Sequence, residues 1–170
     1  MTDPDHSTHA PAEDVLNLVG FRIEDWRFAV RLAQVRTSIM PCPVTRVFHV
    51  PDYVQGIISL RGTIVGVLDL GRLLGLTGTA GGFRRLIIVS ARNVQAAIPV
   101  HDVFRVPDVS VDRVGPLPSS VGPTQRQYLE GIINTSGMET RGSGDEDTIT
   151  LVDAAMLFES PALRALRGEP

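Results

Sequence analysis

Histidine and cysteine are the scarce residue types in this chain that could support metal or acid–base chemistry, whereas its 19 carboxylates occur throughout and single out no site. The candidates are His6, His9, His49, His101 and the single cysteine, Cys42. His49 and Cys42 lie seven residues apart in a proline-rich stretch, a spacing that fits no zinc-ligand motif. His101 directly precedes Asp102, and neighbouring residues on a strand point to opposite faces, so this pair is interpreted as a strand-end turn. The spacing therefore predicts no metal site and no acid–base pair.

Nucleophilic and phosphate-binding chemistry has no better support. A serine nucleophile needs an elbow such as G-x-S-x-G, which the sequence lacks. Cys42 lies between two prolines, and no pattern places a basic partner beside it. The chain contains no lysine, which excludes a Walker-A phosphate loop, a protein kinase and a pyridoxal enzyme. We therefore expect a protein that is not an enzyme and that uses no cofactor.

Composition narrows the class of protein further. The 170 residues are 43% hydrophobic and 21% charged, with a formal net charge of −3, as in folded globular domains. The isoelectric point is about 5.8 and the arginines are scattered, which argues against nucleic-acid binding. No apolar run approaches the roughly 18–20 residues of a membrane helix. Residues 1–10 lack the basic start and apolar middle of a signal peptide, so the expected location is the cytoplasm, without membrane insertion.

Short runs of alternating or continuous apolar residues, separated by turn signals, predict an all-β protein. A hairpin is expected over Val15–Leu32, with Trp26 in the core, and Ser38–Tyr53 is expected to be a proline-broken loop. Further strands are predicted over 56–60, 63–68, 86–89, 94–100, 129–134 and 148–152, and a single helical turn over 69–74. Asp153 and Ser160 are positioned to cap two short C-terminal helices.

A glycine-rich stretch over residues 75–83 predicts a hinge between two small barrels, which must share an interface because neither could bury much surface alone. The expected organisation is a disordered tail over 1–13, one domain with two barrel subdomains over 14–159, and a C-terminal helix and tail over 160–170. The polar segment 137–147 is expected to be a hairpin loop.

Arg61 is the residue most distinguished by its position. It lies with Gly62 at the tip of a strongly apolar hairpin, Ile57–Val65. It could be a solvated turn arginine, or its guanidinium could tie the turn to a neighbouring loop by hydrogen bonds. The sequence leaves both interpretations open.

This hairpin also carries a resemblance to a known family. The stretch from Pro51 to Leu70, PDYVQGIISLRGTIVGVLDL, resembles the central signature of the CheW-like domain, in which an aliphatic run leads into N-L-R-G and ends in D-L. The segments Phe28–Val35, Val100–Val103 and 129–157 resemble the flanking strands and the end of that family. The resemblance covers about 140 residues, from Val15 to Leu157.

The resemblance implies a fold of two five-stranded SH3-like barrels with short C-terminal helices, and a role without catalysis. CheW-like proteins are adaptors that bridge the cytoplasmic tips of chemoreceptors and the regulatory domain of the histidine kinase CheA, itself CheW-like. It implies a receptor contact near the turn after the second strand and the L-R-G hairpin. The corresponding residues here are Val35, Arg36, Thr37, Leu60, Arg61 and Gly62, and other CheW-like proteins are possible further partners.

Four departures from the family pattern predict a diverged member. Thr37 stands where the family usually has a glutamate, which would be a natural partner for Arg61. Ser59 replaces the asparagine before L-R-G, Gly66 replaces a strand proline, and His101 replaces an aspartate. The alternative to the receptor–kinase adaptor is therefore a CheW-like protein of a pilus, gliding or similar pathway that engages one partner or pairs with itself. An enzyme or a nucleic-acid binder suggested by fold analogy alone has no supporting sequence feature.

Overall fold

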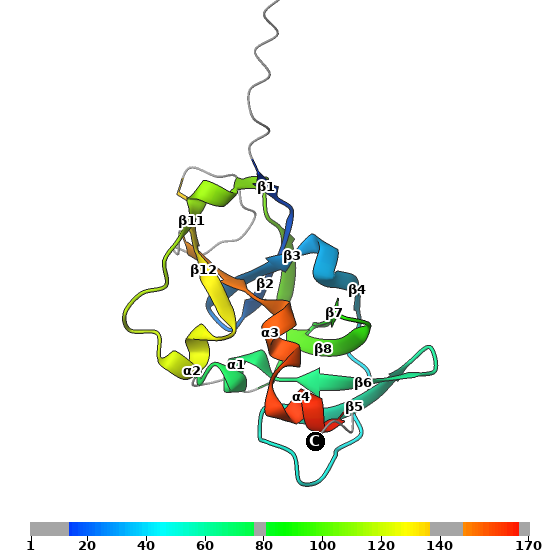
Figure 1. Cartoon of the computed structure of the whole chain (residues 1–170). Helices are drawn as coiled ribbons and strands as arrows, with labels where there is room; N and C mark the ends of the chain where they lie inside the picture. Colours follow the sequence, from blue (N-terminus) through cyan, green and yellow to red (C-terminus); the bar gives the residue numbers. More distant parts are fainter. Residues whose placement is uncertain (1–13, 77–80, 137–147, 167–170) are drawn as a thin grey trace, which may run out of the picture.

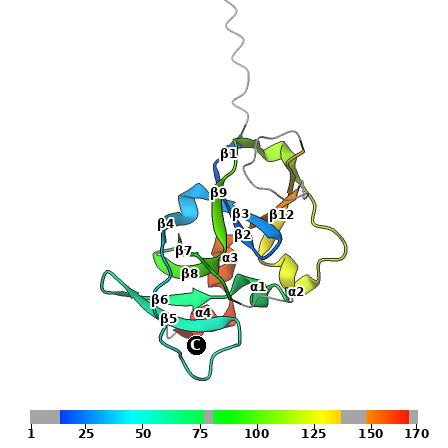
Figure 2. The same cartoon turned by 180° about the vertical axis from the view of Figure 1, so that it is seen from behind.

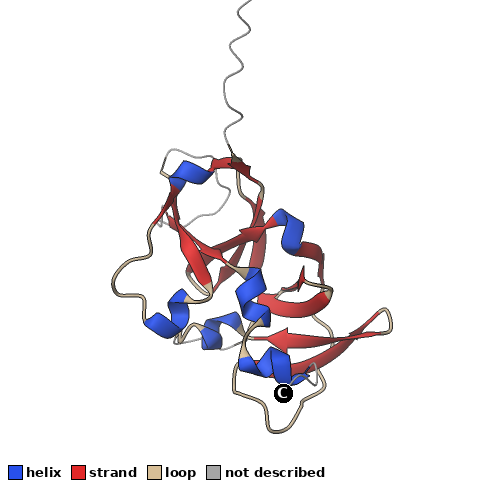
Figure 3. Ribbon diagram, in the orientation of Figure 1, coloured by secondary structure: helices blue, strands red, loops and turns tan. Residues whose placement is uncertain are grey.

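Alternating apolar residues form two principal β-sheets, one of six strands and one of five, accompanied by short helices (Figures 1 and 3). This computed structural model describes residues 14–76, 81–136 and 148–166. The expectations for the tail over 1–13 and for the loop over 137–147 fall outside the described residues. The predicted all-β fold class with short C-terminal helices is confirmed.

The first barrel combines strands from both ends of the chain. Its sheet has the order β11-β12-β13-β3-β2-β9, and β1 pairs with β10. Parallel pairing of β3 with β13 joins the N-terminal hairpin to the C-terminal one. The strands are β1 (Val15–Leu16), β2 (Leu18–Ile23), β3 (Trp26–Arg31), β9 (Asp102–Arg105), β10 (Val109–Ser110), β11 (Val114–Gly115), β12 (Leu129–Asn134) and β13 (Thr148–Val152).

The second barrel is formed by the middle of the chain. Its order is β4-β7-β8-β6-β5, with the strands β4 (Val35–Ile39), β5 (Val54–Leu60), β6 (Thr63–Leu68), β7 (Arg85–Ala91) and β8 (Val94–Val100). Thr45 and Ile57 exchange backbone hydrogen bonds of 2.9 and 2.8 Å, which attach the loop between β4 and β5 to the edge of the sheet. Five strands were predicted for each barrel. The sheet of the second barrel has five, as predicted, whereas the sheet of the first barrel has six.

The chain crosses between the barrels at two places. It leaves the first barrel through the 3-10 helix η1 (Leu32–Gln34) and returns at His101, between β8 and β9. The glycine-rich stretch 75–83 is not such a crossing, because the strands before and after it, β6 and β7, belong to the same five-stranded sheet. Residues 77–80 of that stretch lie outside the described part of the chain.

Three apolar cores stabilise this arrangement. One lies within the first barrel and includes Leu18 and Ile149. Another lies within the second barrel and includes Ile58 and Ile88. The third, called here the joint core, combines side chains of both barrels, among them Phe21, Phe28, Leu68, Ile87, Ile98 and Leu157. The joint core confirms that the barrels share an apolar interface, as their small size requires.

Short helices cover the joint core from outside the sheets. They are α1 (Leu70–Leu73), α2 (Pro123–Arg126), α3 (Ala154–Phe158) and α4 (Pro161–Leu166), and the 3-10 helix η2 (Val111–Arg113) follows β10. The Asp153 carboxylate accepts hydrogen bonds from the backbone of α3, as predicted. Leu163 of α4 is buried in the joint core, so this helix packs on its own chain. The Ser160 hydroxyl has no hydrogen-bond partner among the described residues, so the expected side-chain cap is not formed there.

Two expectations of local structure were wrong. Trp26 was expected in the core, but 50% of its surface is exposed. It pairs with Ile23 next to the turn of the β2–β3 hairpin, at the end of the sheet. There its ring lines a groove and is not enclosed by the core. The loop expected over Ser38–Tyr53 begins later, because Ser38 and Ile39 pair with β7 as part of β4.

Candidate functional site

The first segment of the candidate site is the start of β4. Val35 pairs with Val89 and packs against the joint core, whereas Thr37 is exposed. The pairing register shifts between Val35 and Thr37, which places Arg36 in a β-bulge. The Arg36 Nε atom donates a hydrogen bond of 2.7 Å to the Ser90 hydroxyl of β7, which holds this exposed side chain against the sheet.

The second segment is the turn between β5 and β6, which projects beyond the body of the molecule (Figure 1). Leu60 packs against the core of the second barrel, and Arg61 and Gly62 form the exposed turn with φ angles of 50° and 83°. Two successive positive φ angles are typical of a tight hairpin turn. Within the described residues the Arg61 side chain makes no hydrogen bond or ion pair. The structure therefore favours the interpretation of a solvated arginine over a tie to a neighbouring loop.

Strand register brings the two segments to the same end of the five-stranded sheet. Gly66 of β6 lies opposite Ala96 of the parallel strand β8, so the β5–β6 turn is level with the turn between β7 and β8. Val35 pairs with β7 close to that turn. β4 and β5 form opposite edges of the sheet, and Figures 1 and 2 place both segments on the same side of the molecule.

Exposed apolar side chains accompany these segments, and the sequence analysis did not identify them. Ile64 on β6 is 68% exposed and Leu32 in η1 is 52% exposed, whereas Met40, which is 65% exposed, lies beyond the opposite end of β4. Large exposed apolar side chains on a small domain are typical of protein–protein contact surfaces. The available sequence signal was the position of Ile64 directly beside the hairpin turn, on the outward side of an alternating strand.

His101 joins the two barrels. Its Nδ1 atom accepts a hydrogen bond of 3.0 Å from the backbone N–H of Glu24 in the β2–β3 turn, and its Nε2 atom lies 3.0 Å from the carbonyl oxygen of Gly81. The ring also packs against Phe83, with 4.8 Å between the ring centroids. His101 is thus a structural connection between the barrels, in agreement with its interpretation as part of a strand-end turn.

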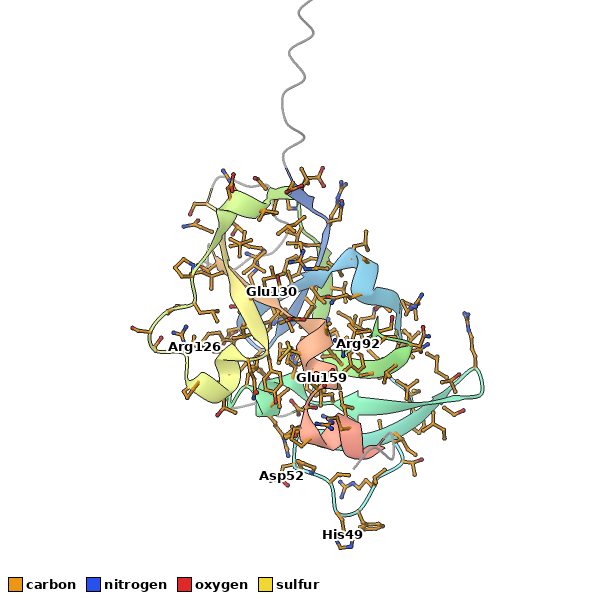
Figure 4. All side chains as sticks on the ribbon, in the orientation of Figure 1. His49, Asp52, Arg92, Arg126, Glu130 and Glu159 are labelled. Carbon is orange, nitrogen blue, oxygen red and sulfur yellow. The ribbon has the colours of Figure 1, made fainter. Side chains whose placement is uncertain are left out.

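An apolar groove of about 520 Å³ lies beside Trp26. Its walls come from β3, β12 and β13 of the first barrel, from Leu74 and Leu76 directly after α1 of the second, and from the loop 117–121 with Gln125 of α2. The Arg126 guanidinium donates hydrogen bonds to the carbonyl oxygens of Leu117, Pro118 and Val121, which fixes this loop (Figure 4). The groove is therefore built from both barrels and has one stabilised wall.

The described residues include no cluster of three or more histidine, cysteine, aspartate or glutamate side chains that could hold a metal ion. In the same part of the chain, no helix has the length and apolar character needed to span a membrane. Cys42 is half-buried and packs against the core of the second barrel.

The family model of the CheW-like domain matches residues 17–162, which include both barrels and the projecting hairpin. The chain belongs to the CheW-like domain family. Its similarity to curated members extends along most of both sequences. It is 32% identical over 142 residues to the probable chemotaxis protein CheW of Rhizobium etli, covering 83% of this chain and 86% of that protein.

Two further CheW proteins show the same extent of similarity. The chemotaxis protein CheW of Rhizobium meliloti is 29% identical over 121 residues, which cover 71% of this chain and 78% of that protein. The crystal structure of the scaffolding protein TtCheW from Thermoanaerobacter tengcongensis superposes with a TM-score of 0.70 at 23% identity, covering 87% of this chain and 95% of that one. The structural likeness shows that the two-barrel CheW fold is present here.

Proposed function

We propose that this CheW-like protein is a non-catalytic adaptor of a chemosensory array, which couples methyl-accepting chemoreceptors to the histidine kinase CheA in the cytoplasm. The observation that carries the proposal is the projecting hairpin, whose exposed arginine makes no side-chain hydrogen bond or ion pair among the described residues and lies beside exposed apolar side chains. The family match across both barrels supports it, because an adaptor needs two contact surfaces on one rigid body.

The receptor contact is assigned to Val35, Arg36, Thr37, Leu60, Arg61 and Gly62. Two observations support this assignment. The start of β4 and the β5–β6 turn lie at the same end of the five-stranded sheet, and the exposed apolar residues Leu32 and Ile64 lie next to them. An arginine offers five donors in a planar fork, which suits carboxylate and carbonyl groups of a receptor helix. The regulatory domain of the kinase, and further CheW-like proteins, would bind exposed apolar surfaces elsewhere on the barrels.

Replacing Arg61 with alanine is expected to weaken binding of the receptor fragment about tenfold, a loss of about 1.4 kcal/mol. The fold should be unaffected, because the exposed Arg61 side chain makes no hydrogen bond or ion pair with the described residues. Calorimetric titration measures the affinity, and thermal melting measures the stability. Arg113→Ala, an exposed arginine of the first barrel, is the matched control and should change neither quantity. A parallel loss of affinity and melting temperature in the Arg61 variant would show that Arg61 has a purely structural role.

The function is tested by binding of the purified full chain to two partners, first separately and then together. The partners are the cytoplasmic fragment of a chemoreceptor and the regulatory domain of CheA from the same cell. Binding to each, and formation of a ternary complex, is the expected result. Binding to one partner alone would favour the diverged CheW-like protein, with Thr37 as the first residue to examine. Binding to neither folded partner would refute the adaptor function.

A further inference from the structure

Formal charge is distributed very unevenly along the chain. Residues 35–100, which contain the whole second barrel, carry seven arginines and only two acidic residues, Asp52 and Asp69. This segment therefore has a formal charge of +5 within a chain of net charge −3, and the rest of the chain has −8. The second barrel is therefore basic, although the isoelectric point of the whole chain is acidic.

The arginines of the second barrel all lie at its surface. Three of them have partners: Arg36 donates to Ser90, Arg72 lies 3.5 Å from Asp69, and Arg92 forms an ion pair of 2.8 Å with Glu159 (Figure 4). The other four are exposed and have no side-chain hydrogen bond or ion pair within the described part of the chain. These are Arg46, Arg61, Arg84 and Arg85.

The first barrel shows the opposite pattern. Its arginines are largely used internally: Arg31 pairs with Glu130 at 2.5 Å, Arg22 donates to the carbonyl oxygen of Glu24, and Arg126 fixes a loop (Figure 4). The hydrogen bond from Arg31 to Glu130 is the main cause that raises the pKa of Arg31. Several carboxylates remain exposed on this barrel, among them Asp25, Asp108 and Asp112. Outside residues 35–100, the described residues carry nine carboxylates and seven arginines, a formal charge of only −2, so the clear excess of charge is the positive one on the second barrel.

We infer that the second barrel is an electrostatic docking surface for a protein partner whose contacting face is rich in carboxylates. Unpaired guanidinium groups on a rigid barrel form charge-assisted hydrogen bonds with carboxylates at no cost of breaking existing ion pairs. A nucleic acid fits less well, because the arginines are spread over a loop, a hairpin turn and the start of β7, and the rest of the chain carries −8. The inference rests on the proposed function only in taking its two partners as the candidates.

Such a charge distribution acts mainly on the rate and orientation of association. Complementary fields raise association rates by about tenfold to a thousandfold, and salt screens them beyond about 10 Å. Dissociation depends on the close contacts and changes less. An acidic partner should therefore approach the second barrel first, and this approach should be slower in salt.

The test compares two double charge reversals that both change the net charge by −4. R84E/R85E removes positive charge from the second barrel, and R105E/R113E removes the same charge from exposed positions of the first. Stopped-flow association is measured with the receptor fragment and with the kinase regulatory domain, at about 50 and about 300 mM NaCl. For at least one partner we expect R84E/R85E, and high salt with the unmodified chain, each to slow association about tenfold. R105E/R113E should slow it less than about twofold, and equal melting temperatures should verify the fold of both variants.

Four results would overturn the inference. Equal slowing by both double variants would show that net charge matters and the second barrel does not. An association rate that changes neither with salt nor in either double variant would show that binding does not depend on charge. The proposed adaptor function would then stand, but the electrostatic docking surface would not. Duplex DNA that binds more tightly than either protein and responds to R84E/R85E would reassign the surface to nucleic acid. If neither protein binds, the adaptor function and this inference both fail.

Discussion

Replacing Gly56 with alanine is expected to destabilise the protein by about 3 kcal/mol, because the site has neither the backbone conformation nor the space for a side chain. Gly56 has a φ of +144°, and a Cβ atom would lie 2.2 Å from the carbonyl oxygen of Thr45. That carbonyl accepts the backbone N–H of Ile57 in the bridge between the β4–β5 loop and β5. The substitution should therefore detach the loop from the strand that leads into the Arg61 hairpin.

Urea unfolding followed by circular dichroism measures this loss. The matched control is Gly115→Ala at the edge strand β11, where a Cβ would meet no atom closer than 3.7 Å and φ is not in the left-handed region. The control should lose less than about 1 kcal/mol. Similar losses for both variants would contradict the account of how the loop closes the second barrel.

Replacing Leu157 with alanine is expected to cost about 3 kcal/mol, because the side chain is fully buried in the joint core. α3 packs against β7 of the second barrel, although it follows β13 of the first. A cavity under this helix should therefore weaken the contact between the barrels as well as the fold. If a binding surface spans both barrels, its affinity for the partner should fall when this contact is weakened.

The neighbouring Met156 is partly exposed and gives a matched control on the same helix. Met156→Ala should change the free energy of unfolding by less than about 1 kcal/mol. Urea unfolding of both variants decides the point. If Leu157→Ala were as mild as Met156→Ala, the joint core would not be the element that holds the barrels together.

The hairpins could be predicted from the sequence because their signals are local. Each signal lies within a few residues of the strands that it defines. These signals are the alternation in Phe28–Leu32, the Arg61-Gly62 turn and the Arg92-Asn93 turn. Asp69 and Asp153 cap their helices through neighbouring backbone groups, which are also local. Strands of two residues, such as β1 and β10, carry no period-two pattern and were not predicted.

The division into barrels could not be predicted locally. The glycine-rich stretch looked like a boundary because glycines favour flexible connections, yet pairing of β7 with β4 and of β6 with β8 keeps both flanks in one sheet. Those pairings join residues far apart in the sequence, and parallel pairing leaves no turn signal. The prediction that Trp26 is buried was wrong for a related reason. Its exposure depends on segments far away in the sequence, such as the loop 117–121 across the groove.

The candidate site was predicted in part. Arg61 was predicted from its place at a hairpin tip, and Val35 and its neighbours through the family resemblance; their role in binding stays a prediction. Ile64 and Leu32 were missed because apolar type predicts burial, and only the folded chain shows which side chains lack a neighbour to cover them. The partners of His101, Glu24 and Gly81, lie 77 and 20 residues away, so its role as a connection between barrels had no sequence signal.

Kinase activity in a reconstituted array tests the adaptor function most directly. Autophosphorylation of CheA is measured with receptor fragments in their two signalling states, with and without this chain, and with Arg61→Ala in its place. The account predicts that kinase activity follows the receptor state only when the unmodified chain is present, and that Arg61→Ala weakens this coupling. Kinase activity that is the same for both receptor states with the chain bound to both partners would contradict it.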